Sequence, residues 1–233
     1  MLPIQHAAAV LDAVASKTDK VILFFSCGKD SLALLDMCSK RFKEVHLVFM
    51  YFVKNLDHIN RYLVFAKYKY SNIVVHEVPH WNLTYILRGG LYCEANPDQK
   101  IMKLIDVDES IRIKTGINWS IFGMKKADSM NRRIMLKGYD LEAINYATQK
   151  AYPLSTWKDA EVLRYVQMNG LPEPINYEGK KRSSGVGFDL DVFLYLRKNY
   201  PNDLHKILTQ FPMSERILFD HDEKERKKSQ FKQ

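Results

Sequence analysis

Three short apolar runs, separated by segments with helical spacing, constrain the fold of this 233-residue sequence more than any other feature. The first run, residues 21–25, is continuously apolar, as expected for a strand covered on both faces. Residues 44–52 and 72–78 are expected to form the second and third strands. Between them, residues 31–42 and 56–70 place apolar side chains on one helical stripe. Strands and helices that alternate with short connections predict an α/β fold, a mostly parallel sheet wound by helices.

The second half of the sequence predicts one more strand and further helices. Residues 119–122 form an apolar run that ends at Gly123 and indicates a fourth strand. Helices are expected over residues 97–105, 107–114, 129–137, 189–199 and 203–210. Thr156 is the expected N-cap of another helix, with Asp159 at its third position and an end near Met168. We therefore expect an α/β domain over residues 1–187 and a helical extension over residues 188–233, with a charged tail from about residue 220.

Composition predicts a soluble protein of the cytoplasm. Hydrophobic residues make up 46% and charged residues 27% of the chain, which is ordinary for a globular protein. No apolar run approaches the roughly 20 residues that cross a bilayer, and the N-terminal segment has no leading cationic stretch of a signal peptide. The cysteines, Cys27, Cys38 and Cys93, form no closely spaced pair. This sparse set suits a reducing compartment and predicts neither a zinc site nor an iron–sulfur cluster.

The net positive charge of the sequence has three possible explanations. The formal net charge is +8, with an isoelectric point near 9.2. The excess lies inside the globular part, in the basic groups at residues 125–126, 132–133 and 180–182. A lysine-rich solvated surface, a site for a small polyanion and a nucleic-acid surface all fit this balance.

Residues 26–31 (Ser-Cys-Gly-Lys-Asp-Ser) lie between the first strand and the first helix. In a wound sheet, ligands collect where parallel strands end, and the first turn of a helix favours an anion. Gly28 lets the backbone approach a ligand closely. Hydroxyl and ammonium donors are supplied by Ser26, Lys29 and Ser31. The segment predicts a phosphate-binding loop, and a capped turn without a ligand is the structural alternative.

Three segments resemble the phosphoadenosine phosphosulfate (PAPS) reductase branch of the adenine nucleotide alpha hydrolase superfamily. Residues 25–35 resemble its modified phosphate loop, Ser-Gly/Phe-Gly-x-Asp-Ser. Residues 123–132 are similar to Gly-x-Arg-x-x-Glu-Ser-x-x-Arg, with Lys125 and Asp128 as conservative departures. Residues 152–172 are similar to Pro-Leu-x-x-Trp…Asp-Val…Tyr…Leu-Pro. The matches occur in the family's order and imply its α/β fold, which is Rossmann-like.

The resemblance implies a nucleotide site with two sides. Phosphate contacts are implied for Ser26, Cys27, Gly28, Lys29, Asp30 and Ser31. The opposite side is implied at Gly123, Lys125, Ser129 and Arg132, and a donor-rich segment adds Arg182 and Ser184. The candidates for catalysis are Lys29, Asp30, Lys125 and Arg132. Asp30 could also hold Mg²⁺ together with the nucleotide.

The implied substrate is ATP, PAPS or adenosine phosphosulfate (APS), and the implied reaction occurs at the α-phosphate or its substituent. Reductases of this family use a cysteine in a C-terminal Glu-Cys-Gly-x-His segment, whereas the last cysteine here is Cys93. We therefore expect ATP pyrophosphatase, adenylyl-transfer or sulfur-transfer chemistry, and no thioredoxin-dependent sulfonate reduction.

Two other functions stay open from the sequence. One is a nucleotide-sensing or regulatory partner protein without catalysis, and the other is a nucleic-acid-binding protein with a relic loop. An enzyme of this kind could use a nucleic acid or a protein as its second substrate. Residues 78–93 further resemble a subgroup encoded by phages and mobile elements, which would place the protein in the cytoplasm of a host. The sequence gives no oligomeric state.

Overall fold

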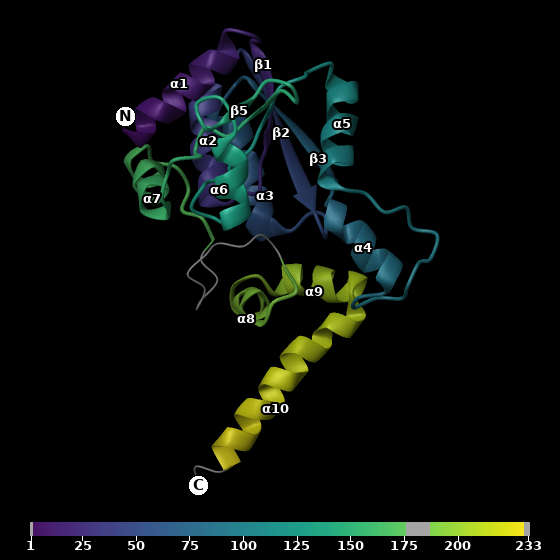
Figure 1. The fold of residues 1–233 in the computed structure, drawn as a ribbon. Helices are drawn as coiled ribbons and strands as arrows, with labels where there is room; N and C mark the ends of the chain where they lie inside the picture. Colours follow the sequence, from purple (N-terminus) through teal and green to yellow (C-terminus); the bar gives the residue numbers. More distant parts are fainter. Residues whose placement is uncertain (1, 176–186, 231–233) are drawn as a thin grey trace. The chain divides into compact units, whose positions relative to one another are not determined.

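The computed structural model describes residues 2–175 and 187–230, and it contains a six-stranded, mostly parallel sheet with helices on both sides (Figure 1). The strands are β1 (Lys20–Phe24), β2 (Glu44–Tyr51), β3 (Ile73–Pro79), β4 (Ser120–Ile121), β5 (Ile144–Asn145) and β6 (Lys150–Ala151). Their order in the sheet is β3-β2-β1-β4-β6-β5. β1 runs parallel to β2 and to β4, β4 runs parallel to β6, and β5 is antiparallel to β6. The predicted α/β fold is confirmed.

The expected helices around the first three strands are confirmed, and an additional one precedes them. Helix α2 (Lys29–Ser39) begins directly after the loop that follows β1, and α3 (Asp57–Lys69) joins β2 to β3. Helix α1 (Pro3–Ala15) was not expected from the sequence. Its first position is a proline, whose fixed φ suits a helix start, and Val10, Leu11 and Val14 are fully buried.

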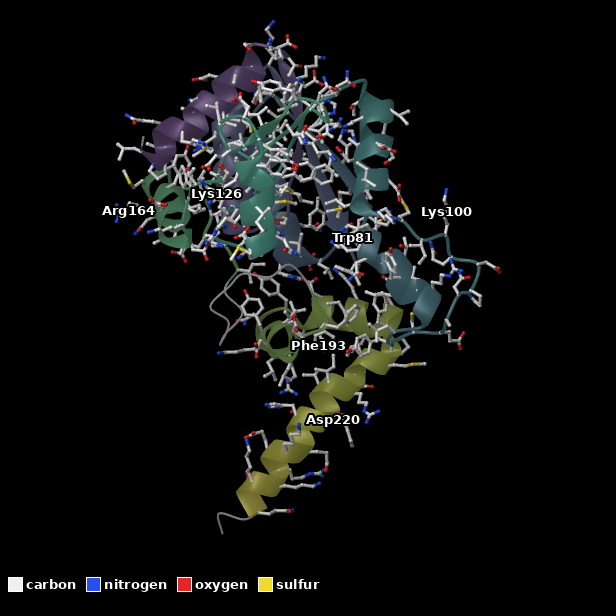
Figure 2. The ribbon with its side chains drawn as sticks, in the orientation of Figure 1. Trp81, Lys100, Lys126, Arg164, Phe193 and Asp220 are labelled. Atoms are coloured by element: carbon white, nitrogen blue, oxygen red, sulfur yellow. The ribbon has the colours of Figure 1, made fainter. Side chains whose placement is uncertain are left out.

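The later helices are α4 (Trp81–Gly89), α5 (Leu104–Thr115), α6 (Met130–Lys137), α7 (Asp159–Met168), α8 (Leu190–Asn199), α9 (Pro201–Gln210), the short 3-10 helix η1 (Pro212–Glu215) and α10 (Arg216–Gln230). Of the described helices, none combines the length and the apolar character that crossing a membrane requires. The side chains of the described residues are shown in Figure 2, and the buried apolar ones include Ile22, Leu23 and Leu47 of the central strands.

Two expectations for the second half are wrong. Residues 97–103 are irregular, and helix α5 begins only at Leu104. The amide of Met102 donates instead to the Thr84 hydroxyl at 3.0 Å, so tertiary contacts replace helical hydrogen bonds in this segment. Thr156 is not an N-cap: its hydroxyl has no hydrogen-bond partner among the described residues. Helix α7 begins at Asp159, where Glu161 accepts the amide of Lys158 at 2.6 Å.

The chain forms two compact units whose segments alternate along the sequence. The first unit comprises residues 1–50, 62–78 and 104–174, and it contains most of the sheet. The second comprises residues 51–61, 79–103 and the described residues from 175 onward. The second unit therefore includes the C-terminal helices expected after residue 188 together with two segments that the sequence assigned to the sheet domain.

A buried histidine–aspartate pair connects separate segments inside the second unit. Asp203 accepts the amides of Asp57 and His58 at 2.8 and 2.9 Å, and it contacts the His58 Nδ1 at 2.6 Å. Both side chains are fully buried. The carboxylate of α9 thus satisfies the otherwise unpaired first amides of α3.

Candidate functional site

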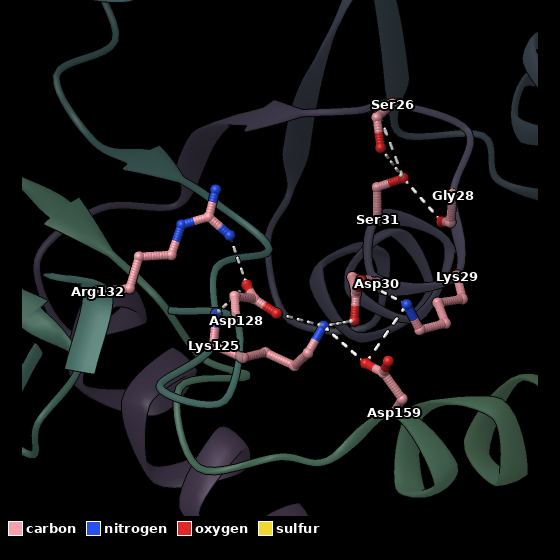
Figure 3. A network of polar contacts seen from close by, with 9 residues as sticks. All are labelled: Ser26, Gly28, Lys29, Asp30, Ser31, Lys125, Asp128, Arg132 and Asp159. Carbon is pink, nitrogen blue, oxygen red and sulfur yellow. Dashed lines mark hydrogen bonds and ion pairs between the residues drawn. The ribbon is translucent and has the colours of Figure 1, made fainter. Parts of the chain in front are cut away.

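The loop between β1 and α2 is held by its two serines. The Ser31 hydroxyl donates to the carbonyl oxygen of Gly28 at 2.9 Å and accepts the amide of Ser26 at 3.2 Å (Figure 3). Cys27 has a φ of 59°, in the left-handed region, and this residue turns the chain from the strand into the helix. The first amides of α2 have no intrahelical partner, so the loop presents N–H donors at the positive end of a helix dipole.

Lys125 is the centre of the polar network beside this loop. Its ammonium lies 2.5 Å from Asp30, 3.3 Å from Asp159 and 3.4 Å from Asp128, measured to a carboxylate oxygen of each. The contact to Asp30 is a hydrogen bond, and the contacts to Asp159 and Asp128 are ion pairs. The side chain is only 2% exposed. Burial acts to lower the pKa of Lys125, but Asp30 and the other carboxylates outweigh it and raise the pKa above its usual value.

Lys29 and Arg132 extend the network on either side of Lys125. The Lys29 ammonium lies 3.2 Å from Asp30 and 3.4 Å from Asp159, and Arg132 donates to Asp128 at 2.6 Å. Burial acts to raise the pKa of Asp128 and of Asp159, yet the neighbouring hydrogen bonds and cations hold both below their usual range. The network thus brings three cationic side chains together with three carboxylate side chains, and its formal charge is zero (Figure 3).

Gly123 explains how the segment after β4 comes so close to α2. A Cβ atom at this position would lie 3.2 Å from the Cβ of Asp30 and 3.6 Å from a methyl group of Leu34. The contact to Asp30 is tighter than most Cβ contacts in proteins. Glycine thus permits the approach that lets Lys125 reach Asp30.

Of the remaining expected residues, one caps a helix and two are not described by the structure. Ser129 is the N-cap of α6, and its hydroxyl accepts the amide of Arg132 at 3.2 Å. Arg182 and Ser184 lie outside the described residues. The sequence reading did not assign Asp128 or Asp159 to the site. Both residues lie in the segments that resemble the family, and this position is the sequence feature that could have assigned them to the site.

The donor set around Asp30 does not fit a magnesium ion held by the protein. One carboxylate oxygen of Asp30 contacts the ammonium of Lys125, and the other contacts that of Lys29. A metal ion there would have to displace a lysine. Within the described ranges, no three histidine, cysteine, aspartate or glutamate side chains are grouped to hold a metal ion.

The three thiols are buried, and burial raises the pKa of each of them. Cys27 lies in the loop itself, Cys38 in α2 and Cys93 between α4 and α5. A nucleophilic cysteine needs an accessible thiolate, and these thiols stay protonated at neutral pH.

The chain is similar to a protein family and, at low identity, to solved structures. A solved NH3-dependent NAD synthetase from Campylobacter jejuni subsp. jejuni NCTC 11168, in complex with the nitrate ion, is 15% identical with a TM-score of 0.45. The alignment covers 93% of this chain and 96% of that one. No curated protein matches the chain. The family model of the phosphoadenosine phosphosulfate reductase domain matches residues 20–181, which include the loop and the Lys125 network. Because this match covers more than half of the sequence, the chain belongs to the phosphoadenosine phosphosulfate reductase domain family.

Proposed function

We propose that the chain binds an adenine nucleotide with its phosphates at residues 26–31 and acts at the α-phosphate or its substituent. The supporting observation is a loop with unpaired helix amides beside cationic side chains, inside the segment that matches the family. Either adenylyl transfer with release of pyrophosphate or sulfur transfer fits this arrangement. ATP, PAPS and APS are the candidate substrates.

The proposed roles follow from the contacts. Ser26, Gly28 and Ser31 shape the loop, and Cys27 contributes its backbone. Lys29 and Arg132 are the cations proposed to stabilise negative charge that develops on a phosphate, because fixed cations favour such a transition state. Lys125 is engaged by three carboxylates, so its proposed role is to position Asp30 and Asp159. Gly123 permits that contact, and Ser129 fixes the start of α6. We retain Arg182 and Ser184 as further anion contacts.

Thiol chemistry is not part of the proposal. A sulfonate reductase of the thioredoxin-dependent kind attacks its substrate with a thiolate, and the cysteines of this chain are buried with raised pKa values. Water or another nucleophile from a second substrate would take the place of the thiol.

A non-catalytic nucleotide-binding protein is the second candidate. The observation that favours it is the complete pairing of Lys125 and the double pairing of Lys29 with carboxylates. The nucleic-acid alternative has less support, because Lys126 also has an acidic partner, Glu142.

A thermal-shift panel with ATP, AMP, APS and PAPS tests nucleotide binding. A ligand at 100 times its dissociation constant stabilises a protein by about 2.7 kcal/mol, which raises the melting temperature by several degrees. Ser31→Ala removes the three hydrogen bonds that the Ser31 hydroxyl makes within the loop and should abolish this shift together with any pyrophosphate release from ATP. Ser39→Ala is the matched control, because that hydroxyl contacts a carbonyl oxygen at the other end of α2. The proposal is wrong if no adenine nucleotide raises the melting temperature of the unmodified protein.

A further inference from the structure

Among the described residues, Asp159 is the carboxylate that contacts both Lys29 and Lys125 from a separate segment of the chain. It is the first residue of α7, whereas Lys29 and Asp30 open α2 and Lys125 follows β4. One of its oxygens lies 3.4 Å from the Lys29 ammonium and 3.3 Å from that of Lys125. Its side chain is 47% exposed, compared with 23% for Asp30 and Asp128.

A phosphate that approaches the Lys29 ammonium competes with two carboxylates that already pair with it. The Lys29 side chain is 11% exposed. Its ammonium lies 3.2 Å from Asp30 and 3.4 Å from Asp159. Asp30 is fixed, because it lies in the same first helical turn and its other oxygen is 2.5 Å from Lys125. The half-exposed Asp159 is the partner that an incoming anion can displace at the smallest cost.

Asp159 is also a negative charge beside the proposed phosphate position. Its cationic neighbours keep it ionised at neutral pH, as its lowered pKa indicates. Repulsion between this carboxylate and a bound anion grows with the charge of the anion. The same side chain therefore competes for Lys29 and repels whatever replaces it.

We propose that Asp159 is a specificity-determining residue, which competes with the ligand's phosphates for Lys29 and weakens binding in proportion to ligand charge. This inference rests on the proposed function, since it places the phosphates at residues 26–31. A highly charged anion has to displace Asp159 and overcome its repulsion, whereas a weakly charged or neutral nucleoside loses little. Asp159 thus discriminates between ligands of high and low charge through an unfavourable contact with the highly charged ones.

Titration calorimetry of the full chain and its Asp159→Asn variant tests the proposal with four probes: adenosine, AMP, ATP and inorganic pyrophosphate. We expect Asp159→Asn to bind ATP and pyrophosphate about tenfold more tightly, the order of magnitude for removing one unit of negative charge beside a bound anion at a partly exposed site. The gain should be smaller for AMP and absent for adenosine. Asp12→Asn is the matched control. Asp12 lies on α1 and pairs with Arg41, and its substitution makes the same charge change away from the network.

The outcomes separate this inference from the proposed function. If ATP binds the unmodified protein and Asp159→Asn leaves ATP and pyrophosphate affinity equal or weaker, the competition is refuted while nucleotide binding stands. If pyrophosphate binding tightens in the variant but adenine nucleotides bind no better than pyrophosphate, the competition holds and the proposed function fails. If no probe binds either protein, both fail. Asp159→Ser is the second variant if the ligand-free melting temperature shows that Asp159→Asn is poorly folded, because serine suits a helix start without charge.

Discussion

Lys125 is a buried cation surrounded by carboxylates, and its loss should destabilise the first unit. Removing one partner of a buried ion pair typically costs about 3–5 kcal/mol, because the remaining charge is left without compensation. We expect Lys125→Met to lower the stability of the protein by roughly this amount. Lys125→Arg keeps the charge and should cost less, although its planar fork suits the three contacts less well.

Urea unfolding followed by circular dichroism measures this difference. Lys126→Met is the control, since Lys126 is the neighbouring lysine and has a single acidic partner on a half-exposed turn. Equal unfolding midpoints for Lys125→Met and the unmodified protein would contradict the role of Lys125 as the centre of the network.

The burial of the thiols makes a second prediction for single residues. In the native protein, a thiol-specific reagent should label Cys27, Cys38 and Cys93 slowly, at a rate set by local opening of the structure. In urea, all three should react at once. Fast labelling of a single thiol in the native protein, lost in Cys27→Ser, would instead identify a reactive cysteine in the loop.

The sequence proposed residues on both sides of the site but left out Asp128 and Asp159, two of the carboxylates that pair with its cations. Ser26, Gly28 and Ser31 could be assigned because a loop between a strand and a helix has a known geometry. The sequence also proposed Lys125 as a phosphate contact, whereas the structure shows it paired with Asp30, 95 positions earlier in the chain. Burial and long-range pairing of this kind depend on tertiary packing, which residue spacing alone does not contain.

At the scale of elements, the absence of a side chain at Gly123 lets the segment after β4 approach α2 closely. Gly123→Ala would place a Cβ atom 3.2 Å from Asp30, so that the segment must shift outward. We expect a loss of about 1–3 kcal/mol in stability, as for other overpacked sites, and weaker nucleotide binding because Lys125 moves with the segment. The melting temperature and the nucleotide-induced shift measure the two effects.

Gly89→Ala is the matched control for this substitution. An added Cβ atom at Gly89 meets no atom within 4 Å, and the residue lies in helix α4. Alanine there should be neutral or slightly stabilising, since it is the better helix former. A loss of stability in Gly89→Ala as large as that in Gly123→Ala would refute the steric explanation.

The sheet shows which elements a sequence can specify locally. The apolar runs of β1, β2 and β3 and the stripes of α2 and α3 are long enough to be recognised within the sequence. Strands β5 and β6 are two residues each and exist because they pair with one another and, for β6, with β4. Residues 97–103 were expected to be helical, but they are irregular, and the amide of Met102 donates to the Thr84 hydroxyl instead of to a helical carbonyl.

At the scale of the whole molecule, the His58–Asp203 pair should make the second unit sensitive to acid. Burial lowers the pKa of His58 more than its hydrogen bond to Asp203 raises it. The unfolded chain therefore binds a proton at a higher pH than the folded chain, and stability falls as the pH drops below about 6.5. The Nε2 of His58 has no described hydrogen-bond partner, which also disfavours a proton there. Asp203 has a lowered pKa, and its contribution is lost only at a much lower pH, below the usual aspartate value of 3.8.

Urea unfolding at pH 7.5 and pH 5.5 tests this sensitivity. We expect the unmodified protein to lose up to about 1 kcal/mol between these values through His58, and His58→Gln to lose less. His205→Gln, at an exposed position of the same helix as Asp203, should retain the pH dependence of the unmodified protein. An unchanged pH dependence in His58→Gln would contradict the assignment.

The alternation of the two units along the chain also affects how the protein is made. Phe52 and Tyr92 of the second unit both contact the ring of Phe188, which in turn packs against Phe211. A ribosome adding about 5–20 residues per second leaves these early aromatic rings without their partners for several seconds. During that interval the nascent chain exposes apolar surface that folding will later cover. Chaperones are therefore most useful to this protein while α8 and α9 are still being synthesised, even after the strands of the sheet have left the ribosome.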